Sequence, residues 1–114
     1  MRSLLLVIVL ALGFVAAARP AAAADVRMYV RHAVTDYAAW RKAYNDFDAT
    51  RRKMGVTAQA VYRSVDNPNE VTVTHDFRSV DKAKAFAAST ALTSTMEKAG
   101  VKDTEIWFTT KADK

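Results

Sequence analysis

A turn-forming segment at residues 66–70, Asp-Asn-Pro-Asn-Glu, lies between two runs of strand-forming residues. The runs, residues 57–65 and 71–77, are rich in β-branched and aromatic side chains that favour strands, whereas Asp, Asn and Pro favour turns. The sequence therefore predicts a β-hairpin in the middle of the chain. This hairpin constrains the fold, because the segments on either side of it must extend the same sheet or cover it.

A strand pattern and a helical pattern precede the hairpin. Residues 26–34 alternate between apolar and polar positions, which predicts a strand with one buried face. Residues 36–54 follow with apolar spacings of three and four, Thr35 or Asp36 is suited to cap this helix, and Gly55 is a typical helix stop. The stripe of the predicted helix comprises Tyr37, Trp40, Tyr44, Phe47, Arg51 and Met54.

A second helix and a last strand follow the hairpin. Ser79 is suited to cap a helix, and a weak point at residues 89–90 divides that helix from a second short helical segment at residues 91–99. Residues 104–110 alternate in polarity and predict the last strand. The predicted order is therefore β-α-β-β-α-β.

This order predicts an α+β, ferredoxin-like fold with one four-stranded antiparallel sheet. Right-handed crossovers place both helices on one face of the sheet and make the first and third strands central neighbours. The helix-covered face then carries Met28, Val30, Val71, Val73, Phe77, Ile106 and Phe108. The opposite face carries several charges together with Tyr29, Tyr62, Thr72, Thr74 and Trp107.

The opposite face is too aromatic for a purely solvated surface and too polar for the dry core of a monomer. Two copies packed sheet to sheet would cover it. We therefore expect a homodimer with Tyr29, Tyr62 and Trp107 in its interface. The alternative is that these three are scattered surface aromatics, which are common on proteins.

Residues 1–24 have the pattern of a cleavable export signal. Arg2 precedes an apolar run at residues 4–18, which is short for a membrane span, and small residues follow up to Ala24. We expect cleavage near Ala24-Asp25, which leaves one domain at residues 25–114, periplasmic or secreted and free of the membrane. The alternative is an uncleaved anchor. The chain has no cysteine, so it forms no disulfide and carries no lipoprotein anchor.

The charge of the chain is only mildly basic. Removal of the predicted signal, which contains Arg2 and Arg19 and no acidic residue, lowers the formal net charge from +5 to +3. The cationic run at residues 51–53 lies where cations stabilise the end of the predicted first helix, so we interpret it as a solvated helix end. We expect no nucleic-acid partner.

Several segments resemble a known family. Residues 34–40 (VTDYAAW), 61–71 (VYRSVDNPNEV), 83–87 (AKAFA) and 96–101 (MEKAGV) are similar to small bacterial proteins of the dimeric α+β barrel fold. These proteins are related to antibiotic-biosynthesis monooxygenases and are often labelled cyclases. The resemblance covers essentially all of residues 25–114 and implies this fold. Members include cofactor-free oxygenases, polyketide cyclases and haem-degrading enzymes, so the resemblance implies no single activity.

Two histidines are the candidate proton-transfer groups. His32 and His75 both have the parity of the helix-facing side of their strands, where an imidazole could exchange a proton near neutral pH. We predict His75 as the catalytic residue and His32, Trp40 and Tyr44 as ligand-binding residues, with the two aromatics holding a flat ligand. The alternatives are hydrogen-bonded histidines at the margin of the core and an aromatic wall that only packs. The sequence does not fix whether the two histidines meet.

We expect no metal and no cofactor. A metal site needs three or four converging ligands, and the two histidines and scattered carboxylates have no ligand spacing. Residues 80–99 have no histidine of the kind that haem-degrading relatives carry on the later helix. Asn67 and Asn69 match residue types of cofactor-free oxygenases, but their place in the hairpin turn is a sufficient local reason for them.

Three functions stay open. The first is an exported enzyme, a cofactor-free monooxygenase or cyclase, that acts on an aromatic or polyketide-like compound. The second is a protein that binds such a compound without converting it. The third is a structural or interaction module that dimerises through its sheet and has no cavity. An open cavity beside His75 would favour the first two.

Overall fold

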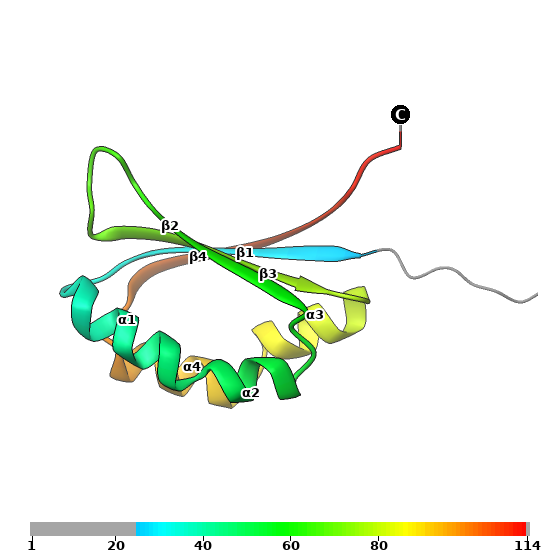
Figure 1. The fold of residues 1–114 in the computed structure, drawn as a ribbon, viewed down its shortest axis with the longest axis horizontal. Helices are drawn as coiled ribbons and strands as arrows, with labels where there is room; N and C mark the ends of the chain where they lie inside the picture. The colour runs from blue at the N-terminus through cyan, green and yellow to red at the C-terminus, as the bar shows by residue number, and fades with distance from the viewer. Residues whose placement is uncertain (1–24, 114) are drawn as a thin grey trace, which may run out of the picture.

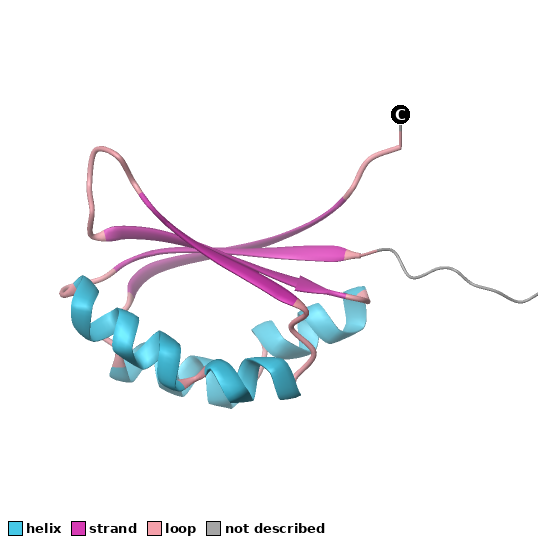
Figure 2. Cartoon of the chain, viewed as in Figure 1, coloured by secondary structure: helices cyan, strands magenta, loops and turns pink. Residues whose placement is uncertain are grey.

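The computed structural model describes residues 25–113, which form one four-stranded antiparallel sheet covered on one side by helices (Figures 1 and 2). The strands are β1 (Val26–Ala33), β2 (Ala58–Arg63), β3 (Glu70–Phe77) and β4 (Lys102–Thr110), in the sheet order β2-β3-β1-β4. The helices are α1 (Tyr37–Asp46), α2 (Asp48–Lys53), α3 (Val80–Ala87) and α4 (Thr90–Lys98). The predicted ferredoxin-like order and the central pairing of the first and third strands are confirmed.

The helix-facing side of the sheet forms the core, as predicted. Alternate residues of β1 and β3 are almost fully buried there, namely Val26, Met28, Val30, Val71, Val73 and Phe77. Phe86 of α3 and Trp40 of α1 pack onto them from the helices. Ile106 and Phe108 are only half-buried, because β4 is an edge strand.

The open side of the sheet is half polar and half aromatic. Tyr29 stacks on Trp107 of the neighbouring strand with ring centroids 5.1 Å apart, whereas Tyr62 on the edge strand β2 is exposed. Ion pairs that cross between strands occupy much of the remaining surface: Arg27 with Asp76, and Arg31 with Glu70 and Glu105. The face therefore has the composition predicted for it, and both of these arginines are already paired within the chain.

The sequence predicted one continuous helix over residues 36–54, and this prediction is wrong, because the helix is interrupted at Phe47. The backbone carbonyl of Tyr44 accepts a hydrogen bond of 2.6 Å from Nη1 of Arg51, and the Phe47 amide donates to both Ala43 and Tyr44. This competition for the Tyr44 carbonyl tightens the turn at Phe47 and separates α1 from α2. Asp36 caps α1 and Gly55, at φ 107°, follows the end of α2, as expected.

The second helical region divides where the sequence predicted it. Ser89 Oγ accepts a hydrogen bond from the Leu92 amide at the start of α4, and it donates one of 2.8 Å to the Phe86 carbonyl at the end of α3. One hydroxyl thus ends one helix and begins the next. Ser79 caps α3 in the same way, through the amide of Lys82.

The β2–β3 loop bends away from the helices, on the open side of the sheet (Figure 1). Asn67 Oδ1 accepts a hydrogen bond from the Asn69 amide, and Ser64 Oγ accepts from the amides of Asp66 and Asn67. Asparagine therefore has the local role in this turn that its sequence position suggested.

The predicted export signal at residues 1–24 lies outside the described residues. Within residues 25–113, none of the helices combines the length and the apolar character needed to cross a membrane.

Candidate functional site

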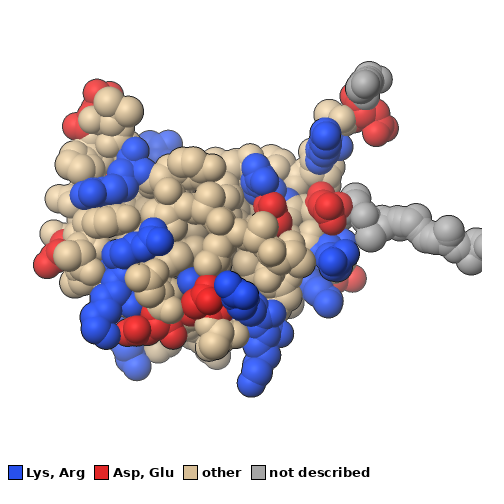
Figure 3. All heavy atoms as spheres, in the orientation of Figure 1, with Lys and Arg blue, Asp and Glu red and all other residues tan. Residues whose placement is uncertain are grey.

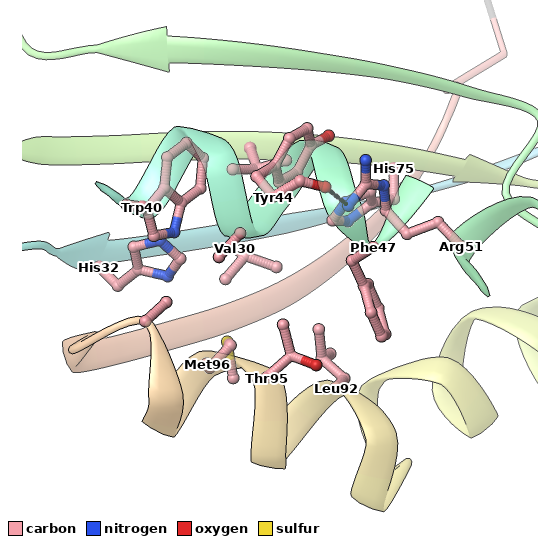
Figure 4. A pocket seen from close by; sticks show the side chains of 13 residues that line it. Val30, His32, Trp40, Tyr44, Phe47, Arg51, His75, Leu92, Thr95 and Met96 are labelled. Atoms are coloured by element: carbon pink, nitrogen blue, oxygen red, sulfur yellow. Dashed lines mark hydrogen bonds between the residues drawn. The ribbon is translucent and has the colours of Figure 1, made fainter. Parts of the chain in front are cut away.

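A small apolar cavity of about 40 Å³ lies between the sheet and the helices (Figure 4). Val30, His32, Val73 and His75 of β1 and β3 form its floor. One wall comes from α1 and α2, with Trp40, Ala43, Tyr44, Phe47 and Arg51, and the other from α4, with Leu92, Thr95, Met96 and Ala99. A cavity of this size holds a few water molecules, so a ring-sized ligand needs the two helical walls to part.

The structure brings all four predicted site residues to this one cavity. His32, Trp40, Tyr44 and His75 line it and are at most 9% exposed. The two histidines do not meet, however. In the β1–β3 register His75 lies opposite Met28 and His32 lies opposite Val71, so the imidazoles occupy opposite ends of the cavity floor (Figure 4).

An aromatic chain connects the two ends. The ring of His32 lies edge-on to Trp40 at 5.6 Å, Trp40 stacks on Tyr44 at 5.0 Å, and Tyr44 stacks on His75 at 6.3 Å. These spacings are typical of attractive aromatic pairs. This row of aromatic rings fixes the orientation of α1 over the sheet and gives the cavity one flat wall.

Five buried polar atoms around this cavity have no hydrogen-bond partner among residues 25–113. They are both ring nitrogens of His32, both ring nitrogens of His75 and the hydroxyl oxygen of Tyr44. Each such atom costs about 1–3 kcal/mol relative to a hydrogen-bonded one. A folded core tolerates few of them, and their concentration at one cavity points to a site for a polar group.

Burial keeps both imidazoles neutral. It lowers the pKa of His32 to about 4, and it lowers that of His75 to about 4 as well, where the Arg51 cation adds to the effect and Asp76 opposes it. Burial also raises the pKa of the Tyr44 hydroxyl, although the nearby cations of Arg51 and Arg41 oppose this. At neutral pH the cavity therefore presents two neutral imidazoles, each able to donate and accept, and one protonated phenol.

Arg51 is the site residue that the sequence interpretation missed. It was expected at a solvated helix end, but its side chain is only 2% exposed, and the structure corrects that interpretation. Its guanidinium lies 3.6 Å from the centre of the Tyr44 ring and bonds to Gln59 Oε1, to Asp48 Oδ1 and to the Tyr44 carbonyl. These partners lie on three elements and compensate the burial of the charge. Its place in the apolar stripe of the first helix was the signal that could have identified it.

The α4 wall was also missed. The predicted cavity had only the first helix and the sheet as walls, whereas Leu92, Thr95, Met96 and Ala99 contribute a third side. Their spacing of three, one and three residues places them on one face of a helix. This face can be recognised in the sequence, but the element that it faces cannot. Only the crossover connection to β4 brings this face opposite α1.

The other residues weighed for chemistry lie elsewhere. Asn67 and Asn69 are in the exposed β2–β3 loop, and Asp36 caps α1. No group of three or more His, Cys, Asp or Glu side chains comes together within residues 25–113 in a way that could hold a metal ion.

Charges of both signs lie next to each other along the helices (Figure 3). Lys42 pairs with Asp46 at 2.8 Å and Arg52 pairs with Asp48 at 3.0 Å, both one helical turn apart. Arg52 is exposed, so this second member of the cationic run has the solvated position predicted for it.

Solved structures share this fold at low sequence identity. A candidate antibiotic biosynthesis monooxygenase from Bordetella bronchiseptica superposes with a TM-score of 0.68 at 14% identity, covering 78% of this chain and 98% of that chain. SnoaB, a cofactor-independent oxygenase from Streptomyces nogalater, gives 0.67 at 16% identity over 81% and 97%. A conserved protein from Methanosarcina mazei gives 0.64 at 16% identity over 79% and 95%.

No protein-family model matches the chain, and no curated protein matches it. At identities of 14–16% the structural likeness shows the fold. This chain therefore has the ferredoxin-like α+β fold of the antibiotic biosynthesis monooxygenase-like proteins.

Proposed function

We propose that this protein binds a small aromatic or polyketide-like molecule in the cavity between α1, α4 and the sheet. The observation that carries the proposal is the set of unpartnered polar atoms of His32, His75 and Tyr44 around an otherwise apolar space. An apolar pocket with a few placed polar groups is the usual form of a small-molecule site.

The chemistry that fits this site is cofactor-independent oxygenation. The shared fold with SnoaB, itself a cofactor-independent oxygenase, supports this choice. His75 would accept the proton of a phenol or another acidic ring compound, and the cation of Arg51, which lies 3.6 Å from the centre of the Tyr44 ring, would stabilise the anion that remains. Dioxygen would then place one oxygen atom on the ring and leave the other as water, so that a phenol gives a quinone and supplies all the electrons.

A cyclase is the neighbouring possibility, because it needs only the orientation of a flexible chain and help with proton transfer. The small cavity volume favours a different alternative, a structural or interaction module without a ligand. One property distinguishes these possibilities. An oxygenase or a cyclase needs His75 to be accessible to a bound molecule, whereas a structural or interaction module does not.

The assembly and location that we propose follow the sequence analysis. A second copy would cover the open sheet face around Tyr29, Tyr62 and Trp107, whose cross-strand ion pairs leave little unbalanced charge to desolvate. The leader at residues 1–24 would direct the protein to the periplasm or outside the cell.

Oxygen uptake with electron-rich phenols tests the oxygenase chemistry. We expect uptake by the purified protein, loss of at least about tenfold in His75→Leu, and no change in Lys84→Ala, an exposed control on α3. Uptake that is equal in all three proteins, or absent from the wild type, would remove the oxygenase proposal. Native mass spectrometry of protein purified from its own cells would then show whether a retained small molecule supports binding alone.

A further inference from the structure

The two buried histidines lie at opposite ends of one cavity, and this spacing carries information about the ligand. His32 is four residues along β1 from Met28, which pairs with His75, so the Cα atoms of the two histidines are offset by about 13 Å along the strands at a rise of about 3.3 Å per residue. Both residues are at most 4% exposed, and the side chain of neither has a hydrogen-bond partner in the part of the chain that the structure describes.

Apolar groups occupy the space between these two ends. Val30 and Val73 form the floor, and Figure 4 shows Val30 between the two imidazoles. Trp40 and Tyr44 provide a flat wall, and Leu92 and Met96 of α4 lie opposite. Apart from the hydroxyls of Tyr44 and Thr95, nothing between the two ends can bond to a polar group in the middle of a ligand, which would then lose its water without gaining a partner.

From this arrangement we propose that the cavity takes an elongated, flat molecule with an apolar middle and one hydrogen-bonding group at each end, one for His32 and one for His75. This inference rests on the proposed function and specifies its ligand. Each neutral imidazole can donate or accept, so hydroxyl and carbonyl groups both fit.

The spacing also sets the length of that molecule. Both side chains project from the same face of the sheet, so we take the backbone offset of about 13 Å as the spacing of the two imidazoles. Two hydrogen bonds of about 2.8 Å each then leave about 7–8 Å between the ligand's two polar atoms. A system of two fused six-membered rings with substituents at diagonally opposite ends has this length. A single ring would reach only one histidine at a time.

The ligand must open the cavity to enter, because about 40 Å³ is too small for two rings. The wall that can yield is α4, where the flexible side chain of Met96 lines the site and the Ser89 junction separates α4 from α3. The cost of this opening is offset by hydrogen bonds to imidazole nitrogens that have no partner within residues 25–113 when the cavity is closed.

A matched ligand series tests the inference. The three compounds are the naphthalenediol with hydroxyls at diagonally opposite ends, the corresponding naphthol with one hydroxyl, and the dimethylnaphthalene of the same shape as the diol. Calorimetric titration of the wild-type protein should give the diol an affinity about three- to tenfold above that of the naphthol, and the dimethyl compound the weakest binding.

Variants of the two histidines then test the contribution of each end of the cavity to binding. In His32→Leu and in His75→Leu the preference for the diol over the naphthol should vanish, whereas Lys84→Ala should keep it. Thermal unfolding of each variant checks that it is folded. If the diol and naphthol bind wild type equally, or the preference survives in both variants, the two-ended inference is wrong while the pocket stands. If none of the three compounds binds the folded wild type, the inference and the proposed binding function both fail.

Discussion

Arg51 shows how a single residue can connect three elements of this fold. Its guanidinium bonds to the Tyr44 carbonyl of α1, to Asp48 of α2 and to Gln59 of β2, and it packs against the Tyr44 ring. Its neighbour Arg52 is exposed and pairs with Asp48. Comparing the two arginines therefore measures how much the burial of an arginine side chain contributes to the stability of the fold.

Replacement of Arg51 by alanine should destabilise the fold by about 2–4 kcal/mol, because it leaves a cavity and removes a partner from the buried Tyr44 carbonyl. Arg52→Ala should change stability by less than about 0.5 kcal/mol, as expected for an exposed ion pair. Chemical denaturation with circular dichroism measures both. Equal effects of the two substitutions would mean that Arg51 does not have the structural role described above.

The low pKa values of the two buried histidines predict that the folded protein loses stability in acid. In the unfolded chain an imidazole binds a proton below about pH 6.5, whereas burial holds both pKa values at about 4 in the folded protein. Between these pH values the unfolded state binds more protons, so stability should be highest above pH 6.5 and should fall as the pH drops toward 4, by up to about 3 kcal/mol per histidine.

Unfolding by urea at pH 7 and at pH 4.5 measures this loss. The double variant His32→Leu/His75→Leu is the control, since it keeps the contribution of every carboxylate and removes only that of the imidazoles. We expect a clearly smaller loss of stability in the double variant. The same loss in both proteins would assign the acid sensitivity to the carboxylates instead.

At the scale of the elements, the α3–α4 junction depends on Ser89. Its hydroxyl accepts from the Leu92 amide and donates to the Phe86 carbonyl, so it serves both helix ends. Leu92 and Met96 of α4 form one wall of the cavity, and the position of this wall depends on how α4 begins.

Ser89→Ala should cost about 1 kcal/mol through loss of the N-cap, which for a domain of this size lowers the melting temperature by about 4–8 °C. Thr93→Ala is the matched control, because the Thr93 hydroxyl only donates to the Ser89 carbonyl from an exposed position. Differential scanning calorimetry distinguishes them. A variant at Thr93 that is as destabilised as that at Ser89 would contradict the capping role.

At the scale of the whole molecule, the sheet has one covered face and one open face. Trp107 on the open face and Val80 at the start of α3 are equally exposed in the single chain, at 41% and 42%. They lie on opposite sides of the sheet, so they test which side a second copy covers.

Trp107→Ser should weaken the proposed dimer by at least about tenfold, because large aromatic side chains dominate the energy of buried interfaces. Val80→Ser should leave it unchanged. Light scattering at several protein concentrations reports the mass. A mass near one chain at all concentrations for the wild type, or complete access of Tyr29, Tyr62 and Trp107 to water in the assembly, would rule out the sheet-to-sheet dimer.

The fold was predictable from local signals. Period-two alternation in residues 26–34, the Asp-Asn-Pro-Asn turn, the caps at Asp36 and Ser79 and the weak point at residues 89–90 are each set by residues close together in the sequence. The break at Phe47 was missed because it involves a hydrogen bond from the side chain of Arg51 to the Tyr44 carbonyl, and the same side chain is also held by Gln59 of β2, a contact that local sequence patterns do not show.

The amino-acid sequence by itself determined which face of each strand is buried, and it therefore placed His32 and His75 on the helix-facing side. The tertiary structure alone decided that they lie at opposite ends of a cavity, that α4 closes it and that a cation is buried beside it. The physical reason is range: alternation and capping act between neighbours in the chain. Strand register and the packing of α1 opposite α4 arise from contacts between segments that are tens of residues apart.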